Sequence, residues 1–143
     1  MKKLFLNLSS LAFILMICLF TLNVNAQEVK ERKQIYTYVE NPPSFPGGEK
    51  ALSKYFVENI IYPNDAKEKG IEGKVYLQFV INSDGSVTDV KIIRGLGNTS
   101  LDEEAIRVVK NMPKWIPGKQ NGKVVDVQFT LPIVFKLDKD KKK

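Results

Sequence analysis

Residues 124–135 have an apolar side chain at every second position, with mostly polar residues between them, and this is the longest strand pattern in the chain. The apolar phase consists of Val125, Val127, Phe129, Leu131, Ile133 and Phe135. Because side chains of a strand point alternately to its two faces, the run predicts a strand with one covered face, as in antiparallel sheets. Pro132 has no N–H for a ladder, so we expect this strand at a sheet edge, at least near its end.

A second strand pattern lies earlier in the chain, over residues 74–94. Apolar residues alternate with mostly polar ones in Lys74–Asn82, which predicts a strand over this range. The turn-forming cluster Asn82-Ser83-Asp84-Gly85 follows, and residues 87–94 form the return strand. Two strands separated by so short a turn predict an antiparallel hairpin.

Two segments have the periodicity of amphipathic helices. The first is Glu49–Ile60, whose apolar residues recur at helical spacing until Tyr62-Pro63 interrupts it. A short second helix is expected over Asn64–Lys69, ended by Gly70. The second amphipathic helix begins at Ser100, which fits a capping box with Glu103. Its apolar stripe is formed by Leu101, Ala105, Val108 and Met112.

The element order is helix, short helix, strand, strand, helix, strand. This order predicts an α+β two-layer sandwich, in which two helices cover one face of a three-stranded antiparallel sheet. Trp115, which lies between two prolines, is expected to anchor the core under the end of the sheet.

The N-terminal residues have the pattern of an export signal. Lys2 and Lys3 precede the apolar run Leu11–Leu22, and Val24-Asn25-Ala26 resembles a signal-peptidase site. We expect a signal peptide over 1–26, a leader over 27–45, a domain over 46–137 and a basic tail over 138–143. The alternative is an uncleaved signal anchor, since residues 4–22 are almost long enough to span a bilayer. Either interpretation places the domain outside the cytoplasm.

The residue inventory argues against an enzyme and against a cofactor or metal site. The chain has no histidine, and its one cysteine, Cys18, lies in the export signal, so imidazole and thiolate chemistry are absent from the domain. Of the net charge of +6, two charges lie in the export signal and three in the lysine-rich tail from Lys136, so the folded part is nearly neutral. A nearly neutral exported domain does not favour nucleic acid as a partner.

Several local patterns together resemble the C-terminal domain of TonB, the energy transducer of outer-membrane import in Gram-negative bacteria. They span about Tyr38 to Leu137, and Pro43-Ser44-Phe45-Pro46-Gly47-Gly48 further resembles the variant common in Bacteroidetes-type bacteria. The other matching pieces are Tyr62-Pro63 with Ala66, Gly70-Ile71-Glu72-Gly73-Lys74-Val75, Phe79-Val80-Ile81 with Asp84-Gly85, Glu104-Ala105, Trp115 with Pro117-Gly118, and the final strand up to Phe135.

The resemblance implies a binding module that engages TonB-dependent outer-membrane receptors. In this family the receptor's TonB box, a short extended peptide, adds as a strand beside the last strand of the domain, where unpaired backbone groups can accept it. By position, the implied partner-binding residues are Val125, Asp126, Val127, Gln128, Phe129, Thr130 and Leu131, with Asn59, Ile60, Ile61 and Tyr62.

The resemblance also implies a periplasmic location, with or without a tether to the inner membrane, and inner-membrane energising proteins as further partners. Full TonB proteins carry a functional histidine in their membrane helix, and this chain has none. We therefore expect it not to draw on the proton gradient by itself. The alternative function is a periplasmic structural adaptor that binds peptidoglycan or forms a homodimer through the same edge strand.

Overall fold

The computed structural model describes residues 33–138, and its packed unit begins at Gln34. The predicted signal segment 1–26, the leader up to residue 32 and the tail from residue 139 lie outside the described residues. The elements are β1 (Ile35–Tyr36), α2 (Gly48–Asn59), α3 (Asn64–Glu68), β2 (Gly73–Ile81), β3 (Val87–Arg94), α4 (Thr99–Lys110), β4 (Gly118–Gln120) and β5 (Lys123–Phe135).

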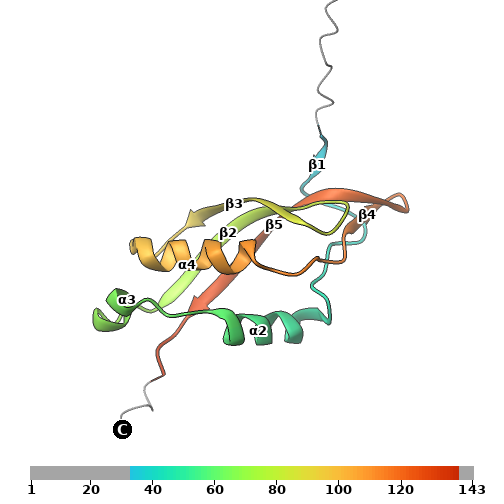
Figure 1. Cartoon of the computed structure of the whole chain (residues 1–143). Coiled ribbons are helices and arrows are strands. Elements are labelled where there is room, and N and C mark those ends of the chain that lie inside the picture. Colours follow the sequence, from blue (N-terminus) through green and yellow to red (C-terminus); the bar gives the residue numbers. More distant parts are fainter. Residues whose placement is uncertain (1–32, 139–143) are drawn as a thin grey trace, which may run out of the picture. The chain divides into compact units, whose positions relative to one another are not determined.

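Strands β5, β2 and β3 lie side by side in that order and form the predicted three-stranded antiparallel sheet (Figure 1). β5 pairs with β2 from Val127 opposite Ile81 to Phe135 opposite Gly73. Two short strands that the sequence pattern did not predict are added to β5. β1 pairs with it in parallel, and β4 pairs with it as the first arm of a hairpin.

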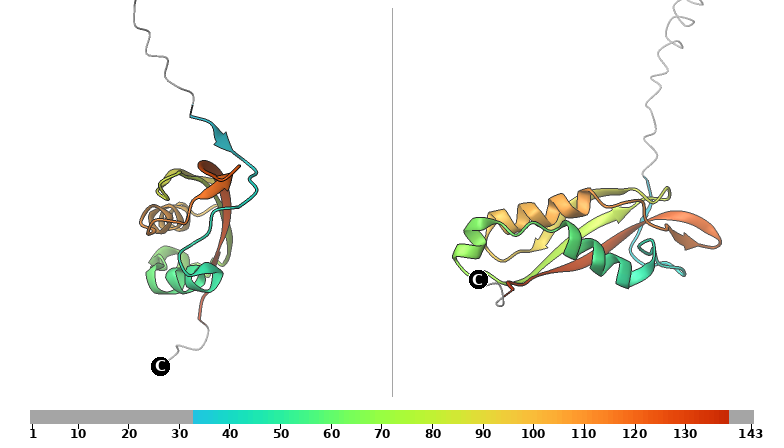
Figure 2. Two further views of the ribbon diagram at one scale, coloured as in Figure 1. Left: turned by 90° about the vertical axis from the view of Figure 1, so that its right-hand side faces the viewer. Right: turned by 60° about the horizontal axis from the view of Figure 1, so that its bottom comes forward.

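The helices α2 and α4 lie on the same face of the sheet (Figure 2), which confirms the two-layer α+β sandwich. The alternating residues Val75, Leu77, Phe79 and Ile81 of β2 are fully buried beneath them. The stripe of α4 faces the same core, and the Tyr55 hydroxyl of α2 donates to the Val108 carbonyl oxygen of α4 at 2.9 Å. The core is completed by the predicted anchor Trp115, which is 4% exposed.

The turn between β2 and β3 closes onto the segment that follows α4. Gly85 has a φ of 85°, in the left-handed region, and its carbonyl oxygen accepts from the Trp115 amide at 2.8 Å. A Cβ at Gly85 would lie 2.2 Å from the Trp115 carbonyl oxygen. Only glycine allows the backbone at position 85 to lie this close to Trp115. The contact fixes Trp115 under the end of the sheet.

The predicted capping box at Ser100 is wrong, because the N-cap of α4 lies two residues earlier in the chain. Its N-cap is Asn98, whose side-chain oxygen accepts from the Leu101 amide at 2.9 Å. The Ser100 hydroxyl instead donates to Asp65 of α3 at 2.8 Å. Asn98 also donates to Asp65, so both side chains join α4 to α3 and lower the pKa of the Asp65 carboxyl.

Candidate functional site

The outer side of β5 is open along its C-terminal part. β2 occupies one side of β5, and β1 pairs with the opposite side at Asp126 and Val127 (Figure 1). Within residues 33–138, no strand pairs with that opposite side from Gln128 to Phe135. The expected edge position is therefore confirmed near the end of β5. Near its start, β5 has β1 as a strand partner on that side.

Pro132 indicates which backbone groups face the open side. It lies opposite Tyr76 of β2, and a proline fits a paired strand only where its nitrogen points away from the partner. Because successive residues of a strand direct their N–H and C=O groups to alternate sides, Gln128, Thr130 and Val134 share the orientation of Pro132. The open edge thus presents the backbone groups of these even-numbered residues.

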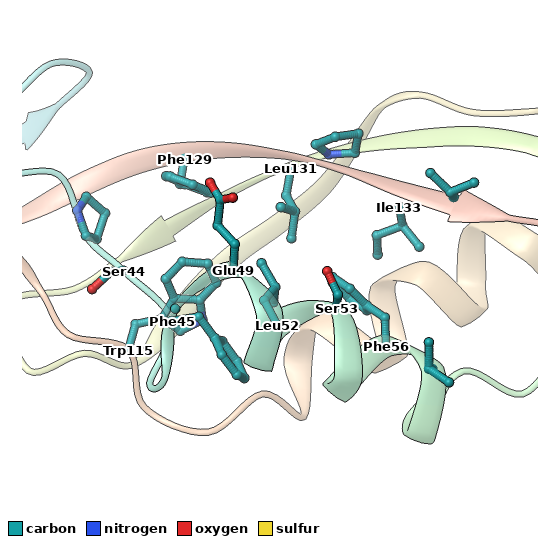
Figure 3. Close-up of a pocket in the computed structure, with 15 residues that line it drawn as sticks. Ser44, Phe45, Glu49, Leu52, Ser53, Phe56, Trp115, Phe129, Leu131 and Ile133 are labelled. Carbon is teal, nitrogen blue, oxygen red and sulfur yellow. The ribbon is translucent and has the colours of Figure 1, made fainter.

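A groove runs between α2 and this edge and has a volume of about 570 Å³ (Figure 3). In the close-up, Phe129, Leu131 and Ile133 follow one another along β5, while Glu49, Leu52 and Phe56 follow along α2. The full lining is Pro43, Ser44, Phe45, Gly48, Glu49, Leu52, Ser53, Phe56, Val57, Trp115, Phe129, Leu131, Pro132, Ile133 and Val134.

The groove is mostly apolar, with an aromatic floor at one end. Phe45 packs edge-on against Trp115 with ring centroids 5.5 Å apart, and Trp115 packs against Phe129 at 5.3 Å. At the other end, Val57 and Val134 form the rim and are 83% and 56% exposed. Glu49 is the only charged residue of the lining. An open backbone edge beside an apolar groove is an arrangement that suits an extended peptide.

The first three residues of the predicted β5 site already have strand partners. Val125 pairs with Gly118 of β4, and Asp126 and Val127 pair with β1. Asp126 belongs to the polar phase of the run 124–135, for which the pattern predicts exposure to solvent, and for this residue that prediction is wrong. The side chain is 5% exposed, and its Oδ1 accepts from the Ser83 amide at 2.6 Å. Of the predicted β5 residues, Gln128, Phe129, Thr130 and Leu131 lie along the open part of the edge.

The predicted segment Asn59–Tyr62 lies near the far end of β5, where the Tyr62 ring packs edge-on against Phe135. Ile60 is half-buried against the core, whereas Ile61 is 69% exposed. The Tyr62 hydroxyl donates to the Ile71 carbonyl oxygen. The structure therefore places Tyr62 beside the last residue of β5, beyond the open positions Gln128–Leu131.

The backbone of this segment is held by an ion pair on α4. Arg107 donates to Glu104 Oε1 at 2.6 Å and to the Asn59 carbonyl oxygen at 2.8 Å, and Glu104 accepts from the Ile61 amide at 2.7 Å. Partial burial opposes ionisation of Glu104, but the hydrogen bonds from Arg107 and Ile61 outweigh it and lower the pKa of this carboxyl. Since these groups are paired, Ile61 offers a side chain rather than a free amide.

Sequence reasoning missed the helix side of the site. Phe45 lies at the end of the predicted leader, and Leu52 and Phe56 belong to the predicted helix Glu49–Ile60. None of the residues of α2 is fully buried, and these three side chains line the groove. Among residues 33–138 there is no group of three or more potential metal-binding side chains. In the same part of the chain, none of the helices has the length and apolar character that crossing a membrane requires.

These features define a class of protein: a small α+β interaction module that offers an open strand edge. The family model for the Gram-negative bacterial TonB protein C-terminal matches residues 58–137, and the chain belongs to this family. The family is a non-enzymatic module of energy-coupled outer-membrane transport, which agrees with the expectation from the residue inventory.

Individual relatives agree with the family match. TonB of Helicobacter pylori is 34% identical over 79 residues, which is 55% of this chain and 26% of that protein. TonB of Pseudomonas aeruginosa is 30% identical over 105 residues, which is 70% of this chain and 30% of that protein. The chain thus matches less than a third of the length of these relatives. The solution structure of the H. pylori TonB C-terminal domain has a TM-score of 0.50 and 29% identity, covering 64% of this chain and 95% of that domain.

Proposed function

We propose that this domain is a periplasmic receptor-binding module that accepts an extended peptide from a TonB-dependent outer-membrane receptor as an added strand on β5. The observation that carries the proposal is the side of β5 from Gln128 to Phe135 that has no strand partner in the described part of the chain. Membership of the TonB C-terminal family supports energy-coupled transport as the process that the binding serves.

The residues proposed to contact the peptide are those along the open part of the β5 edge. Gln128, Thr130 and Leu131 lie beside the added strand, and Phe129 borders the groove. Ile61 and Tyr62 lie near the end of β5 and would meet the end of a longer peptide. At about 0.5–1.5 kcal/mol net per hydrogen bond, roughly four or five backbone bonds give a modest, reversible affinity once the cost of association is subtracted.

The test is a proline substitution on the open side of the strand. Thr130→Pro removes an N–H that faces away from β2, in the same orientation as the native Pro132, so the β2–β5 ladder stays intact. We expect the variant to remain folded by circular dichroism and to lose at least about tenfold in affinity for a synthetic TonB-box peptide. Thr130→Val, which keeps the N–H, is the matched control and should bind normally. Unchanged binding by a folded Thr130→Pro variant would refute the edge assignment.

Val127 is unsuitable for this test, although it lies in the predicted site. It pairs with Ile81 of β2 and with Tyr36 of β1 and is 3% exposed, so a proline there would disturb the fold itself. Pairing with a second copy of the domain would use the same open edge. Analytical ultracentrifugation of the wild-type protein and the Thr130→Pro variant distinguishes the two uses, because only a homodimer makes the sedimentation of the free protein depend on Thr130.

The periplasmic location has its own test. N-terminal sequencing and fractionation of the native protein separate a free periplasmic domain from one tethered to the inner membrane. A pull-down with peptidoglycan provides the other comparison: a protein that binds peptidoglycan and no receptor peptide would be a structural adaptor.

A further inference from the structure

We propose that the α2–β5 groove reads the side chains of the added strand and selects a segment with large apolar residues at alternate positions and a lysine or arginine beside Glu49. This inference rests on the proposed strand addition at the same edge. It adds the chemical class of peptide that the edge accepts, which backbone pairing alone does not specify.

The first step is the direction of the side chains. Phe129, Leu131 and Ile133 are the residues of β5 that face the helices along the groove (Figure 3). A strand added beside β5 continues the pleat, so every second side chain points to the same face and enters the groove. Three such side chains would stand beside these three residues, spaced about 6.6 Å apart.

The second step is the chemistry of the walls. α2 contributes Leu52, Phe56 and Val57, and β5 contributes Leu131 and Ile133, so both walls are mainly apolar along the middle and far end of the groove, with Ser53 of α2 as a polar exception. A volume of 570 Å³ lies within the range of about 300–1,000 Å³ that is usual for ligand pockets. Val57 and Val134 at the rim stay largely exposed. Apolar side chains of an added strand would remove this surface from water.

The third step is the charge at the near end. The Glu49 side chain points toward β5 in the region of Phe129 and Leu131 (Figure 3). It makes no hydrogen bond or ion pair with the described residues. Glu49 is exposed at the mouth of the groove, so its carboxylate attracts a cation there and disfavours an acidic side chain at the same place. At the peptide position whose side chain enters the groove next to Phe129, the assigned residue is therefore lysine or arginine.

The experiment uses synthetic peptides of about nine residues that alternate threonine with a test residue. In the two apolar peptides the test residue is leucine, except that one lysine replaces the first or the last of these leucines. One of the two peptides therefore places its lysine beside Glu49, whichever way the strand runs. The comparison peptide has serine in place of each leucine. Binding to the full chain is measured by titration calorimetry or by fluorescence of Trp115, which lines the groove.

We expect one of the two leucine peptides to bind at least about tenfold more tightly than its serine analogue. Val57→Lys should weaken that peptide about fivefold or more, whereas Val124→Lys, the same change at an exposed valine outside the groove lining, should leave binding unchanged. Glu49→Lys should weaken the lysine peptide and should strengthen a peptide in which glutamate replaces the lysine.

The outcomes separate this inference from the proposed function. Equal binding of leucine and serine peptides, with no effect of Val57→Lys or Glu49→Lys, overturns the groove assignment, while loss of that binding in Thr130→Pro still supports strand addition. Binding that Thr130→Pro leaves unchanged overturns strand addition, and so does failure of every peptide to bind.

Discussion

Glu104 and Arg107 show how one ion pair on α4 holds the backbone of a neighbouring segment. Their hydrogen bonds fix the chain just after α2 through the Asn59 carbonyl and the Ile61 amide. The side chain of Glu104 is 10% exposed and that of Arg107 is 43% exposed, so the pair is screened by solvent on one side only. This geometry makes the contribution of the pair to stability dependent on pH.

We predict that Glu104→Gln lowers the free energy of unfolding by about 1 kcal/mol at pH 7, a value reduced for the exposed side of the pair. The pKa of Glu104 is lowered on folding from its ordinary 4.5, so its stabilisation is present above that value and is lost as the pH falls through the folded-state pKa. The difference between wild type and variant should therefore shrink from about pH 5 downward.

Urea denaturation at a series of pH values measures this difference. Glu103→Gln, at an exposed position of the same helix, is the matched control and should follow the wild type throughout. If the difference in free energy of unfolding between wild type and Glu104→Gln stays constant down to about pH 3, the ionised form of Glu104 is not the stabilising one.

Asp126 shows what a residue pattern can and cannot predict. Alternation in β5 correctly separated the core-facing phase from the other phase, since Val127, Leu131, Ile133 and Phe135 are buried. It could not show that β1 and the turn after β2 cover the other face at Asp126. Burial of a polar residue by distant segments leaves no periodic signal in the sequence.

At the scale of elements, the long strands and both amphipathic helices were predicted to within one or two residues because each has a clear period. β1 and β4 were missed because two or three residues are too short to show one. The hairpin of β4 and β5 nevertheless had a local signal, Asn121-Gly122. Both residues have positive φ, 51° and 73°, as a type I′ turn requires.

The two hairpin glycines provide a matched prediction. Gly85 and Gly122 both have positive φ, so alanine is strained at either by about 1 kcal/mol. At Gly122 a Cβ would meet nothing within 4 Å, but at Gly85 it would lie 2.2 Å from the Trp115 carbonyl oxygen. Gly85→Ala should therefore cost at least about 3 kcal/mol, and Gly122→Ala only about 1 kcal/mol. Equal shifts in urea midpoint would contradict the close contact at Gly85.

At the scale of the whole molecule, the site depends on two elements that are far apart in sequence. The open edge could be predicted from Pro132, a property of one strand, and the resemblance to TonB C-terminal domains pointed to the same strand. The groove could not be predicted, because it depends on how far α2 stands from β5. Leu52 and Phe56 have the same helical spacing whether they are fully packed or line an open groove.

Hydrogen exchange tests the assembled edge directly. The amides of Phe129, Leu131 and Ile133 are expected to face β2 and to be protected in the free protein, whereas those of Thr130 and Val134 face the open side. We predict that the open-side amides exchange about a hundredfold faster or more, and that a bound peptide slows them selectively. Amide exchange followed by NMR, with and without peptide, measures each position. Peptide-induced protection confined to β3, with no change at Thr130 or Val134, would place the peptide on the opposite edge of the sheet.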